Sequence, residues 1–444
     1  MRKKGVAKVL LKRAYKYRLY PSKKQQEKLQ GTLDRVRELY NAALQERRDA
    51  YDIMVKRHPS YYDEAIRKQL SKEHAIGYNQ QANQLPDIKV VREEYREIHS
   101  QVLQDILHRV QKAFDDFLQR VKEGKTPGYP RYKGKDHFDS FCYPQSGFSV
   151  TEDTRICLSK IGTIKVKMHR TLKGTLKTCT IKREGEHWYV VLVCDVEQET
   201  VYHASEEAVG IDLGLLHFAT LSDGRTIENP RYLRQAQAKL ARAQQRVAKK
   251  QRGSKRRKKA GKLVGKAHRK VANQRRDFLY KESHTLVKTY ATIVFEDLSP
   301  GNMSRRPKPK KDEETGEYLP NGAAAKAGLN KSIRDAGWGQ FVHHCQNKAE
   351  EAGSRVLLVN PTYTSQRCSA CGAIKKKTLD ERWHSCPCGC ELDRDHNSAL
   401  DILRLGLEGK TIQKKPPRLR RTKKKRSQAR TEPSGDALLR SPRL

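Results

Sequence analysis

The chain has 444 residues, which is enough for two or three domains with cores of their own. It carries 92 Lys and Arg against 51 Asp and Glu, and the net charge of +41 indicates a polyanionic partner such as nucleic acid. No apolar run reaches the ~18 residues that span a bilayer, and the charged N-terminus lacks a secretory apolar stretch, so we expect a cytoplasmic protein without a membrane partner.

The N-terminal half is predicted to hold a helical region between β-rich segments. A loosely alternating run predicts a strand at 6–20, and Pro21-Ser-Lys-Lys-Gln25 has the pattern of a capping box that opens a helix. Apolar residues at helical spacing predict a second long helix over 98–122. From 141 to 199 the period changes to two, which predicts a β-rich module in the form of a small barrel. The N-terminal strand is a candidate for a further strand of this barrel. The helical region would then be an insertion in this barrel.

The C-terminal half is predicted to alternate short strands with basic helices. A strand beginning at 209 and another at 217–221 precede a very basic helical stretch over 231–290, which Gly253 would break into a hairpin. A further strand ends at Glu296. The remaining predicted elements are a Pro-, Lys- and Gly-rich lid at 301–328, a helix at 338–352, a strand at 356–359 and a helix from 393.

Three acidic residues stand at the ends of these predicted elements. Asp212 follows an apolar run and lies between Gly210 and Gly214, whose small size would let a phosphate backbone approach closely. Glu296 ends an equally apolar strand, and Asp393 opens the last helix. Two-metal nucleases need carboxylates from distant parts of the chain at one point, and Mg²⁺ prefers oxygen ligands. The three acids therefore predict a catalytic magnesium site.

Each acid also has a structural explanation when it is taken alone. Asp393 could be only a helix N-cap, and Glu296 could end its strand in an ion pair. Their order on strand, strand and helix favours the metal site. Asp395 and Asp297 are neighbours that could replace these choices, although Asp297 is expected to face away because strand side chains alternate.

Half of the ten cysteines lie between 368 and 390. Cys368-Ser-Ala-Cys371-Gly is typical of a zinc knuckle, because two thiolates at this spacing can reach one tetrahedral ion. The second half, Cys386-Pro-Cys388-Gly-Cys390, is irregular. We predict a structural zinc site whose four ligands are Cys368, Cys371, Cys386 and Cys388.

Other arrangements of this cluster stay open. Cys390 could replace Cys388, while His384 is a less favoured ligand, and free buried cysteines are the alternative to any metal. A closed four-thiolate site would be structural, so zinc is not expected to be the catalytic metal.

Basic residues are dense between Arg246 and Arg276 and again in the tail after Gly409, which is expected to be disordered. A solvated helix face would explain the first group. The overall charge favours phosphate contacts with a steep salt dependence instead.

Taken together, the motifs resemble the RuvC-type nuclease core of TnpB, the transposon-encoded RNA-guided DNA endonuclease related to type V CRISPR effectors. The resemblance covers nearly the whole chain except the tail. It rests on Gly210-Ile-Asp212-Leu-Gly, Phe295-Glu296-Asp-Leu, Asp335-Ala-Gly-Trp338, Thr364-Ser-Gln-Arg-Cys368-Ser-Ala-Cys371-Gly and Asp393-Arg-Asp-His-Asn397-Ser-Ala, with Tyr17-Arg-Leu-Tyr-Pro21, Leu39-Tyr-Asn41 and Gly128-Tyr-Pro-Arg131 in the N-terminal half.

The resemblance implies an α/β multidomain fold: an RNase H-like (RuvC) core with a zinc-ribbon insertion, a wedge β-barrel and a helical recognition lobe. On this chain the expected domains are the wedge barrel at 1–20 and 124–203, the helical lobe at 21–123, the RuvC-like nuclease at 204–360 and 391–408, the zinc-binding target-nucleic-acid module at 361–390 and the basic tail at 409–444.

The resemblance also implies the activity. A guide RNA from the transposon end would pair with one strand of double-stranded DNA, and one RuvC site with Asp212, Glu296 and Asp393 would cut both strands using Mg²⁺. We expect one protein per RNA, in a prokaryotic cytoplasm and near the nucleoid. Base pairing would supply the sequence, while protein charge would grip backbone and shape.

The family also reads a short duplex motif beside the target. Four polar residues of the helical lobe are candidates for this reading, because they could reach base edges in a groove: Tyr78, Gln80, Ser100 and Gln104. They could equally be ordinary exposed helix residues.

Three other functions stay open from the sequence. The chain could be a compact type V CRISPR effector with the same chemistry, a transposase that joins strands, or a nuclease-idle RNA-guided repressor. The intact set of acids speaks against the last.

Overall fold

The computed structural model describes residues 8–57, 66, 76–126, 128–199, 205–378 and 380–412. Contacts divide the chain into two compact units. The first comprises Met1–Glu207, Pro230–Ala291 and Ser304–Arg355, and the second comprises Ala208–Asn229, Thr292–Met303 and Val356–Leu444. The predicted tail beyond residue 412 and the first two residues of the predicted N-terminal strand lie outside the described residues. Among the described helices, none has the length and apolar character needed to cross a membrane.

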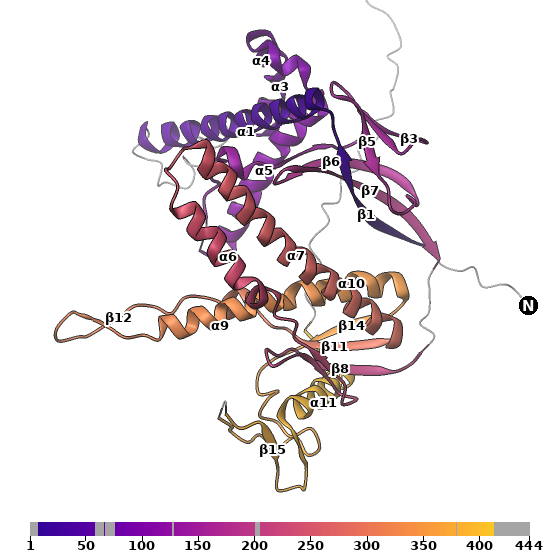
Figure 1. The fold of residues 1–444 in the computed structure, drawn as a ribbon, viewed down its shortest axis with the longest axis vertical. Helices are drawn as coiled ribbons and strands as arrows, with labels where there is room; N and C mark the ends of the chain where they lie inside the picture. Colours follow the sequence, from indigo (N-terminus) through magenta and orange to yellow (C-terminus); the bar gives the residue numbers. More distant parts are fainter. Residues whose placement is uncertain are drawn as a thin grey trace, which may run out of the picture. The chain divides into compact units, whose positions relative to one another are not determined.

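The first unit contains a seven-stranded sheet in the order β2-β6-β7-β1-β5-β4-β3 (Figure 1). The N-terminal strand β1 pairs antiparallel with β7 over most of its length and with β5 at Arg18–Tyr20. It therefore joins the β-rich module, and the first helices are an insertion between strands of one sheet. Closure of this sheet into a wedge barrel stays a prediction. Its strands are β1 (Lys8–Tyr20), β2 (Ser140–Tyr143), β3 (Phe148–Thr151), β4 (Arg155–Leu158), β5 (Gly162–Lys167), β6 (Thr175–Glu184) and β7 (His187–Glu199).

The inserted helices follow the predicted pattern. The capping box opens α1 (Lys23–Arg57), because the Gln25 N–H donates to Ser22 Oγ and the Ser22 N–H donates to Gln25 Oε1 at 2.9 Å. The long helix α5 (Ser100–Lys122) packs against α1 through its buried apolar face. Shorter elements complete the region: α3 (Tyr78–Asn83), α4 (Leu85–Val91), η2 (Glu93–Glu97) and η3 (Lys135–His137).

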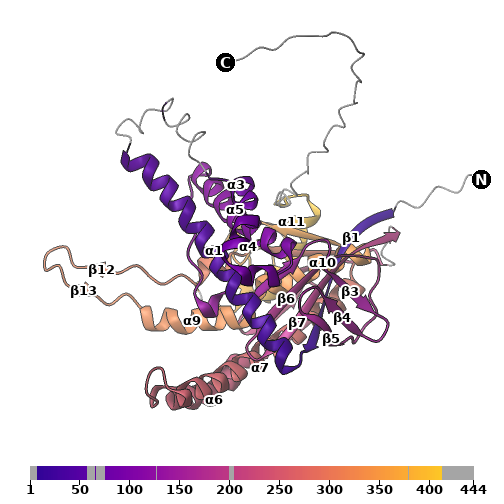
Figure 2. The same cartoon turned by 90° about the horizontal axis from the view of Figure 1, so that it is seen from above.

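The basic stretch of the first unit is a helical hairpin of α6 (Tyr232–Ala248) and α7 (Lys255–Thr289) (Figure 2). Gly253 lies in its turn at φ +83°, as its predicted role as a breaker requires. Asp335 fixes the base of the hairpin, since its carboxylate accepts the Leu233 N–H at 2.9 Å and pairs with Arg275. The other elements here are β12 (Lys310–Lys311) and β13 (Tyr318–Leu319), which form a hairpin in the predicted lid, α9 (Ala323–Ala336) and α10 (Trp338–Ala352).

The second unit is built on a five-stranded sheet in the order β10-β9-β8-β11-β14. Its neighbours β8 and β11 are parallel, whereas β9 is antiparallel to β8 and to β10. The predicted mixed α/β character is thus confirmed. The elements are β8 (Ala208–Asp212), β9 (His217–Leu221), β10 (Thr226–Glu228), β11 (Thr292–Glu296), α8 (Pro300–Met303), β14 (Arg355–Val359), the hairpin β15 (Trp383–Ser385) and β16 (Glu391–Asp393), and α11 (Arg394–Leu407).

Two glycines let α11 lie close to this sheet. A Cβ on Gly210 of β8 would lie 2.2 Å from the Ala399 carbonyl oxygen, and one on Gly406 would lie 2.6 Å from Val294 of β11. Gly210 therefore makes room for a helix. The expectation that its small size serves the approach of a phosphate backbone was wrong.

Candidate functional site

Two of the predicted acids lie at the carboxyl ends of two neighbouring inner strands of the second unit's sheet. Asp212 is the last residue of β8 and Glu296 the last of β11. Because Ile211 pairs with Phe295 in this parallel ladder, the two acids occupy the next position of the same register. Glu296 is buried, with 8% of its surface exposed, and Asp212 is half-buried. The structure thus brings together two residues that are 84 positions apart (296 − 212) in the sequence.

The electrostatics of this pair disfavour its charge. Burial raises the pKa of Asp212 well above its ordinary value, and the charges of Glu296, Asp395 and Asp393 raise it further against the opposing effect of Arg394. Burial also raises the pKa of Glu296, which a hydrogen bond from Thr364 only partly offsets. Carboxylates gathered in this way call for a cation, which marks a candidate metal site.

The third predicted acid, Asp393, has a different place. It is exposed and caps α11, because its Oδ1 accepts the N–H groups of Asp395 at 2.9 Å and His396 at 3.2 Å. Asp395, two residues further on in the first turn of α11, is half-buried and raises the pKa of Asp212 more strongly than Asp393 does. Burial, followed by the charge of Asp393, raises the pKa of Asp395 as well. The N-cap that the sequence left open as an alternative is therefore present.

Side-chain spacing separates the acidic cluster from the cysteines. In the part of the chain that the structure describes, the groups of three or more potential ligand atoms within 4.8 Å of one another lie at the cysteines. The acids form no such tight group. A pair of ions ~3.5–4 Å apart needs a wider arrangement, because different carboxylates contact different ions.

Four thiols converge at the predicted zinc site. Sγ of Cys368 lies 3.7 Å from that of Cys388, and Sγ of Cys371 lies 3.6 Å from that of Cys386. A tetrahedral ion with Zn–S bonds of ≈ 2.3 Å places its sulfur ligands about 3.8 Å apart, so the observed spacing fits zinc. These are the four thiols chosen from the sequence.

The two halves of the site are alike despite their different spacing. Gly372 and Gly389 directly follow Cys371 and Cys388, and both adopt positive φ, +76° and +84°. Cys390 contributes its carbonyl oxygen, which accepts the Cys386 N–H at 3.1 Å. Its thiol belongs to a second possible group, with Cys368 and His384.

The thiol of Cys368 is prepared for ligation. Burial acts to raise its pKa, but N–H groups of Cys371 and Ala370 and a hydrogen bond with His384 outweigh this effect and lower the pKa to about 5. A thiolate is the form that binds metal.

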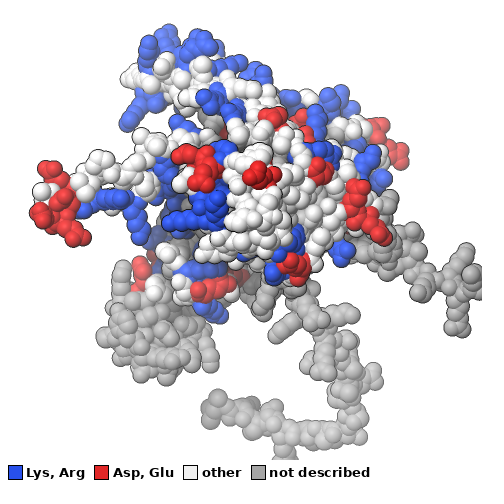
Figure 3. Space-filling view, turned by 90° about the horizontal axis from the view of Figure 1, so that it is seen from below, with Lys and Arg blue, Asp and Glu red and all other residues white. Residues whose placement is uncertain are grey.

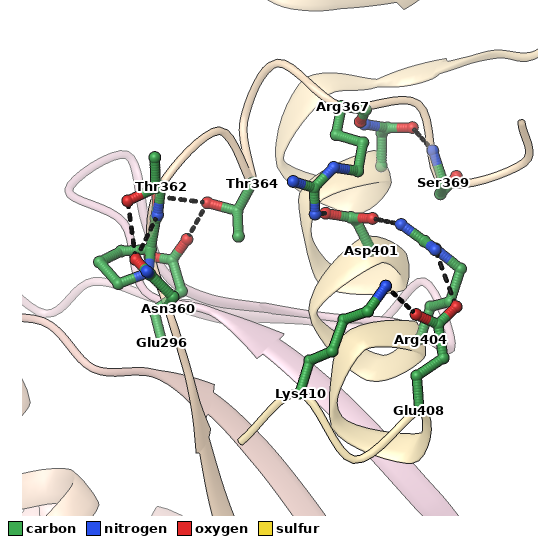
Figure 4. A network of polar contacts seen from close by, with 12 residues as sticks. Glu296, Asn360, Thr362, Thr364, Arg367, Ser369, Asp401, Arg404, Glu408 and Lys410 are labelled. Atoms are coloured by element: carbon green, nitrogen blue, oxygen red, sulfur yellow. Dashed lines mark hydrogen bonds and ion pairs between the residues drawn. The ribbon is translucent and has the colours of Figure 1, made fainter. Parts of the chain in front are cut away.

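Sequence reasoning missed a polar network beside both sites (Figure 4). The Thr364 hydroxyl donates to Glu296, Arg367 pairs with the fully buried Asp401, and Asn397 bonds to the backbone next to Cys368. The only signal was their spacing, since Asn397 and Asp401 are four residues apart and therefore share one face of the last helix.

A basic groove of about 660 Å³ runs between α6 and α7 of the first unit. Between Glu228 and Asp277 the sequence contains no Asp or Glu, so the cations of this stretch have no acidic neighbours within it. Figure 3 is a view of one face of the molecule, and it shows groups of Lys and Arg side chains there. The groove is lined by the cations Lys239, Arg242, Arg246, Lys266 and Lys270 and by Ala243, Ala260, Leu263 and Ala267.

The four candidates for reading duplex DNA occupy varied settings. Tyr78 is half-buried and stacks on His108 with ring centroids 3.7 Å apart. Gln80 caps α3 by accepting the Gly77 N–H, and Ser100 accepts a hydrogen bond from Lys89. Gln104 is exposed. Three of the four thus have structural contacts, and the reading of DNA by these residues stays a prediction.

Comparison with protein families gives three matches along the chain. Residues 191–306 match the OrfB_IS605 family, described as "Probable transposase". Residues 338–402 match the Cas12f1-like TNB domain, and residues 11–53 match the helix-turn-helix domain HTH_OrfB_IS605.

Two relatives resemble most of the chain. InsQ of Escherichia coli (strain K12), named for RNA-guided DNA endonuclease activity, is 32% identical over 335 residues, which cover 74% of this chain and 81% of InsQ. A Streptomyces pristinaespiralis protein named for the same activity is 32% identical over 405 residues, 89% of this chain and 90% of that protein.

The fold also has a counterpart among solved structures. The Cas12f1 chain in the cryo-EM structure of the Cas12f1-sgRNA-target DNA complex aligns with a TM-score of 0.50 at 13% identity, over 88% of this chain and 98% of that chain. At this identity the likeness concerns the fold alone.

Proposed function

Because the chain belongs to the TnpB family, we propose that it is an RNA-guided DNA endonuclease. A guide RNA from a transposon end would select the target by base pairing, and the protein would read a short duplex motif beside it. One acidic site would cleave both DNA strands. The observation that carries this proposal is the pair of the half-buried Asp212 and the buried Glu296, two acids in register on parallel strands whose pKa values are raised.

The residues of the acidic site have distinct roles in this proposal. Asp212 and Glu296 would hold the metal from the sheet, and Asp395 would complete the site from α11. We favour Asp395 over Asp393 because the Asp393 carboxylate already accepts two backbone N–H groups and is exposed, whereas Asp395 is half-buried and has the larger electrostatic effect on Asp212. A pair of Mg²⁺ ions bound there would activate water and stabilise the leaving oxygen.

The four-thiolate cluster would hold zinc for structure. All four positions of a tetrahedron are filled by Cys368, Cys371, Cys386 and Cys388, which leaves none for a reacting water. The proposed division is therefore oxygen ligands for catalysis and sulfur ligands for folding.

The basic groove between α6 and α7 would bind the phosphate backbone of nucleic acid. Its cations are exposed and its floor of alanines and Leu263 can pack against sugars or bases. With no carboxylate in its lining, it would hold a strand without cutting it.

Cleavage of DNA by the purified complex tests this function. RNA that copurifies with the chain is sequenced, a matching DNA target is made, and cutting is measured with Mg²⁺ or with EDTA. We expect both strands to be cut only with Mg²⁺, and Asp212→Ala to reduce the rate on the order of 1000-fold, since lost metal binding costs several kcal/mol in the transition state.

The matched control is Asp223→Ala, which removes an exposed acid from the turn between β9 and β10 and should cut as the parent does. Equal rates for Asp212→Ala and the parent would reject the acidic site. Binding of the target without any cutting by the parent would favour the idle repressor, and joining of strands would favour a transposase. A copurified RNA that derives from a CRISPR array would identify a compact effector instead.

A further inference from the structure

A six-residue segment, residues 364–369, joins the cysteine cluster to the acidic site within the second unit. It contains Thr364, Arg367 and the zinc-site residue Cys368, and it ends at Ser369. We name it the strap. Each of these residues contacts a different part of the site, and Figure 4 shows several of these contacts together.

At its first residue the strap contacts Glu296. Thr364 is 1% exposed, and its hydroxyl lies within hydrogen-bond reach of both Glu296 Oε1 and the Pro361 carbonyl oxygen. A hydroxyl has one proton, so it donates to one acceptor at a time. Donation to Glu296 fixes the direction in which this carboxylate points.

At its other end the strap contacts the first turn of α11 through Asn397. This side chain is fully buried, with Oδ1 accepting the Ser369 N–H at 2.9 Å and Nδ2 donating to the Arg367 carbonyl oxygen at 2.8 Å. Both ends of the amide are used, so the contact fixes the helix relative to the strap in one orientation. Asn397 lies two residues after Asp395, and thus the same contact fixes the backbone that carries this acid.

In its middle the strap contacts the second turn of α11. The Arg367 guanidinium lies 3.5 Å from the carboxylate of Asp401, which has no exposed surface and also pairs with Arg404 at 2.5 Å. A buried charge of this kind is tolerated only with its partners in place. The pair therefore resists sliding of α11 along the strap.

We infer that the strap is a positioning device, through which the cysteine cluster sets the distance between the carboxylates of the proposed metal site. The residues that act are Thr364, which orients Glu296, and Asn397, which places the turn that carries Asp395. The inference rests on the proposed function for its purpose, but its effect is on metal affinity and can be measured without any cutting.

The experiment measures Mn²⁺ affinity by the EPR signal of free Mn²⁺, using full-length chain bound to its copurified RNA, together with zinc content and thermal unfolding. Asn397→Ala should bind Mn²⁺ about 10- to 100-fold more weakly, the usual effect of losing a partner behind a metal ligand. The Mg²⁺ concentration for half-maximal cleavage should rise by a similar factor, while the affinity for RNA stays unchanged.

Ser398→Ala is the matched control. Ser398 lies on the same helix, is 1% exposed and bonds to Arg394 within the helix, without a hydrogen bond to the strap. Its Mn²⁺ affinity should equal that of the parent, so a general effect of disturbing α11 would show as a loss in this variant too.

Thr364→Val and Thr364→Ser decide the outcome if Asn397→Ala does not fold. Valine keeps the shape and loses the hydroxyl, whereas serine keeps the hydroxyl, so the first should weaken Mn²⁺ binding and the second should restore it. Parent-like Mn²⁺ affinity in both Asn397→Ala and Thr364→Val would overturn the inference. If the parent binds Mn²⁺ but cuts no DNA, the proposed function fails while the strap's effect on affinity still stands.

Discussion

The two units of the molecule place charge in opposite ways. In the first unit, the α6–α7 hairpin exposes its cations to solvent, with no acidic residue between Glu228 and Asp277. In the second unit, Asp212 and Glu296 withdraw their carboxylates from solvent at adjacent strand ends. Exposed charges are inexpensive to keep and are screened by salt, whereas buried like charges are costly and need a specific ion.

This difference separates two kinds of dependence on ions. The cationic groove should respond to monovalent salt, because its binding to phosphates releases counterions. The acidic site should respond to divalent ions, because a bound cation relieves the mutual repulsion of its ionised carboxylates. Chelation should therefore stop cutting without releasing RNA, and salt should release RNA without altering the Mg²⁺ requirement of the complex that remains.

The largest effect is expected on comparing the two acids at the start of α11. Asp395→Ala should reduce cleavage on the order of 1000-fold, because it removes a proposed metal ligand. Asp393→Ala should mainly weaken the helix start, by about 0.5–2 kcal/mol of stability, since it removes an N-cap. Rates of DNA cutting and thermal unfolding of both variants provide the measurement.

The opposite pattern would restore the assignment made from the sequence. A variant Asp393→Ala that loses cleavage while it keeps its stability would show that the capping carboxylate also binds the metal. Asp395→Asn is the matched control for helix geometry, and it should lose cleavage while it unfolds close to the parent.

The second comparison concerns sulfur ligands within the second unit. Cys388→Ser should lose the bound zinc and unfold at a lower temperature, because three thiolates leave the site open. Cys390→Ser should keep one zinc per chain, since the Cys390 thiol is not among the four thiols that converge and the substitution keeps the backbone carbonyl that accepts the Cys386 N–H. Zinc content and unfolding temperature measure both effects.

Zinc retained by Cys388→Ser and lost by Cys390→Ser would instead point to the second group, with His384 as a ligand. The Mn²⁺ affinity of each variant then gives an independent check, because loss of zinc should loosen the strap and weaken the acidic site as well.

Much of the fold could be predicted from sequence periodicity. The helices α5 and α10 and the strand β9 begin and end within two residues of the predicted bounds, because each shows a clear apolar period and a clear stop. The hairpin break at Gly253 was also predictable, since glycine is the residue of this cationic run that favours a turn over a helix. The N-terminal strand joins the predicted sheet through β7 and β5.

What the sequence could not provide was the direction of side chains across long distances. Gly210 looked like space for a ligand, but α11 fills that space, and only the packing of residues 189 positions apart (399 − 210) reveals it. Asp393 and Asp395 are chemically equal in the sequence, and the cap geometry alone distinguishes them. Thr364 stood in a motif of the resemblance, but nothing in the sequence indicated its contact with Glu296, because a single threonine carries no period and its partner is 68 residues away.

A smaller effect is expected from charge reversal in the basic groove. Replacing Lys239, Lys266 and Lys270 with Glu should weaken RNA binding and reduce the slope of log affinity against log salt by about 0.7–0.9 for each phosphate that the groove no longer neutralises. Lys255, Lys258 and Lys259 of α7 are exposed and do not line the groove, so the same change at these positions is the matched control. Equal effects of the two triple variants would mean that the hairpin acts through total charge and that the groove has no special role.

The smallest effect is expected on the stability of the metal-free protein, which should increase when the charge of Asp212 is removed. Burial and neighbouring carboxylates raise the pKa of Asp212 in the folded chain above its unfolded value, so folding favours the protonated form. Stability therefore falls as pH rises from the unfolded pKa, ~3.9 for Asp, through the raised folded pKa. At neutral pH the ionised Asp212 should destabilise the metal-free protein, and Asp212→Asn should unfold at a higher temperature.

The size and sign of that gain can be followed by thermal unfolding. Each kcal/mol relieved should raise the unfolding temperature by roughly 2–4 °C for a unit of 150–250 residues, and the difference should shrink as pH falls toward the unfolded pKa. Added Mg²⁺ should stabilise the parent more than Asp212→Asn. An ion that binds the folded state stabilises it, and the variant lacks the carboxylate that would hold the ion. A parent that is more stable than Asp212→Asn in EDTA would mean that this carboxylate has a structural partner, and the buried acids of the second unit would then no longer contrast with the exposed cations of the first.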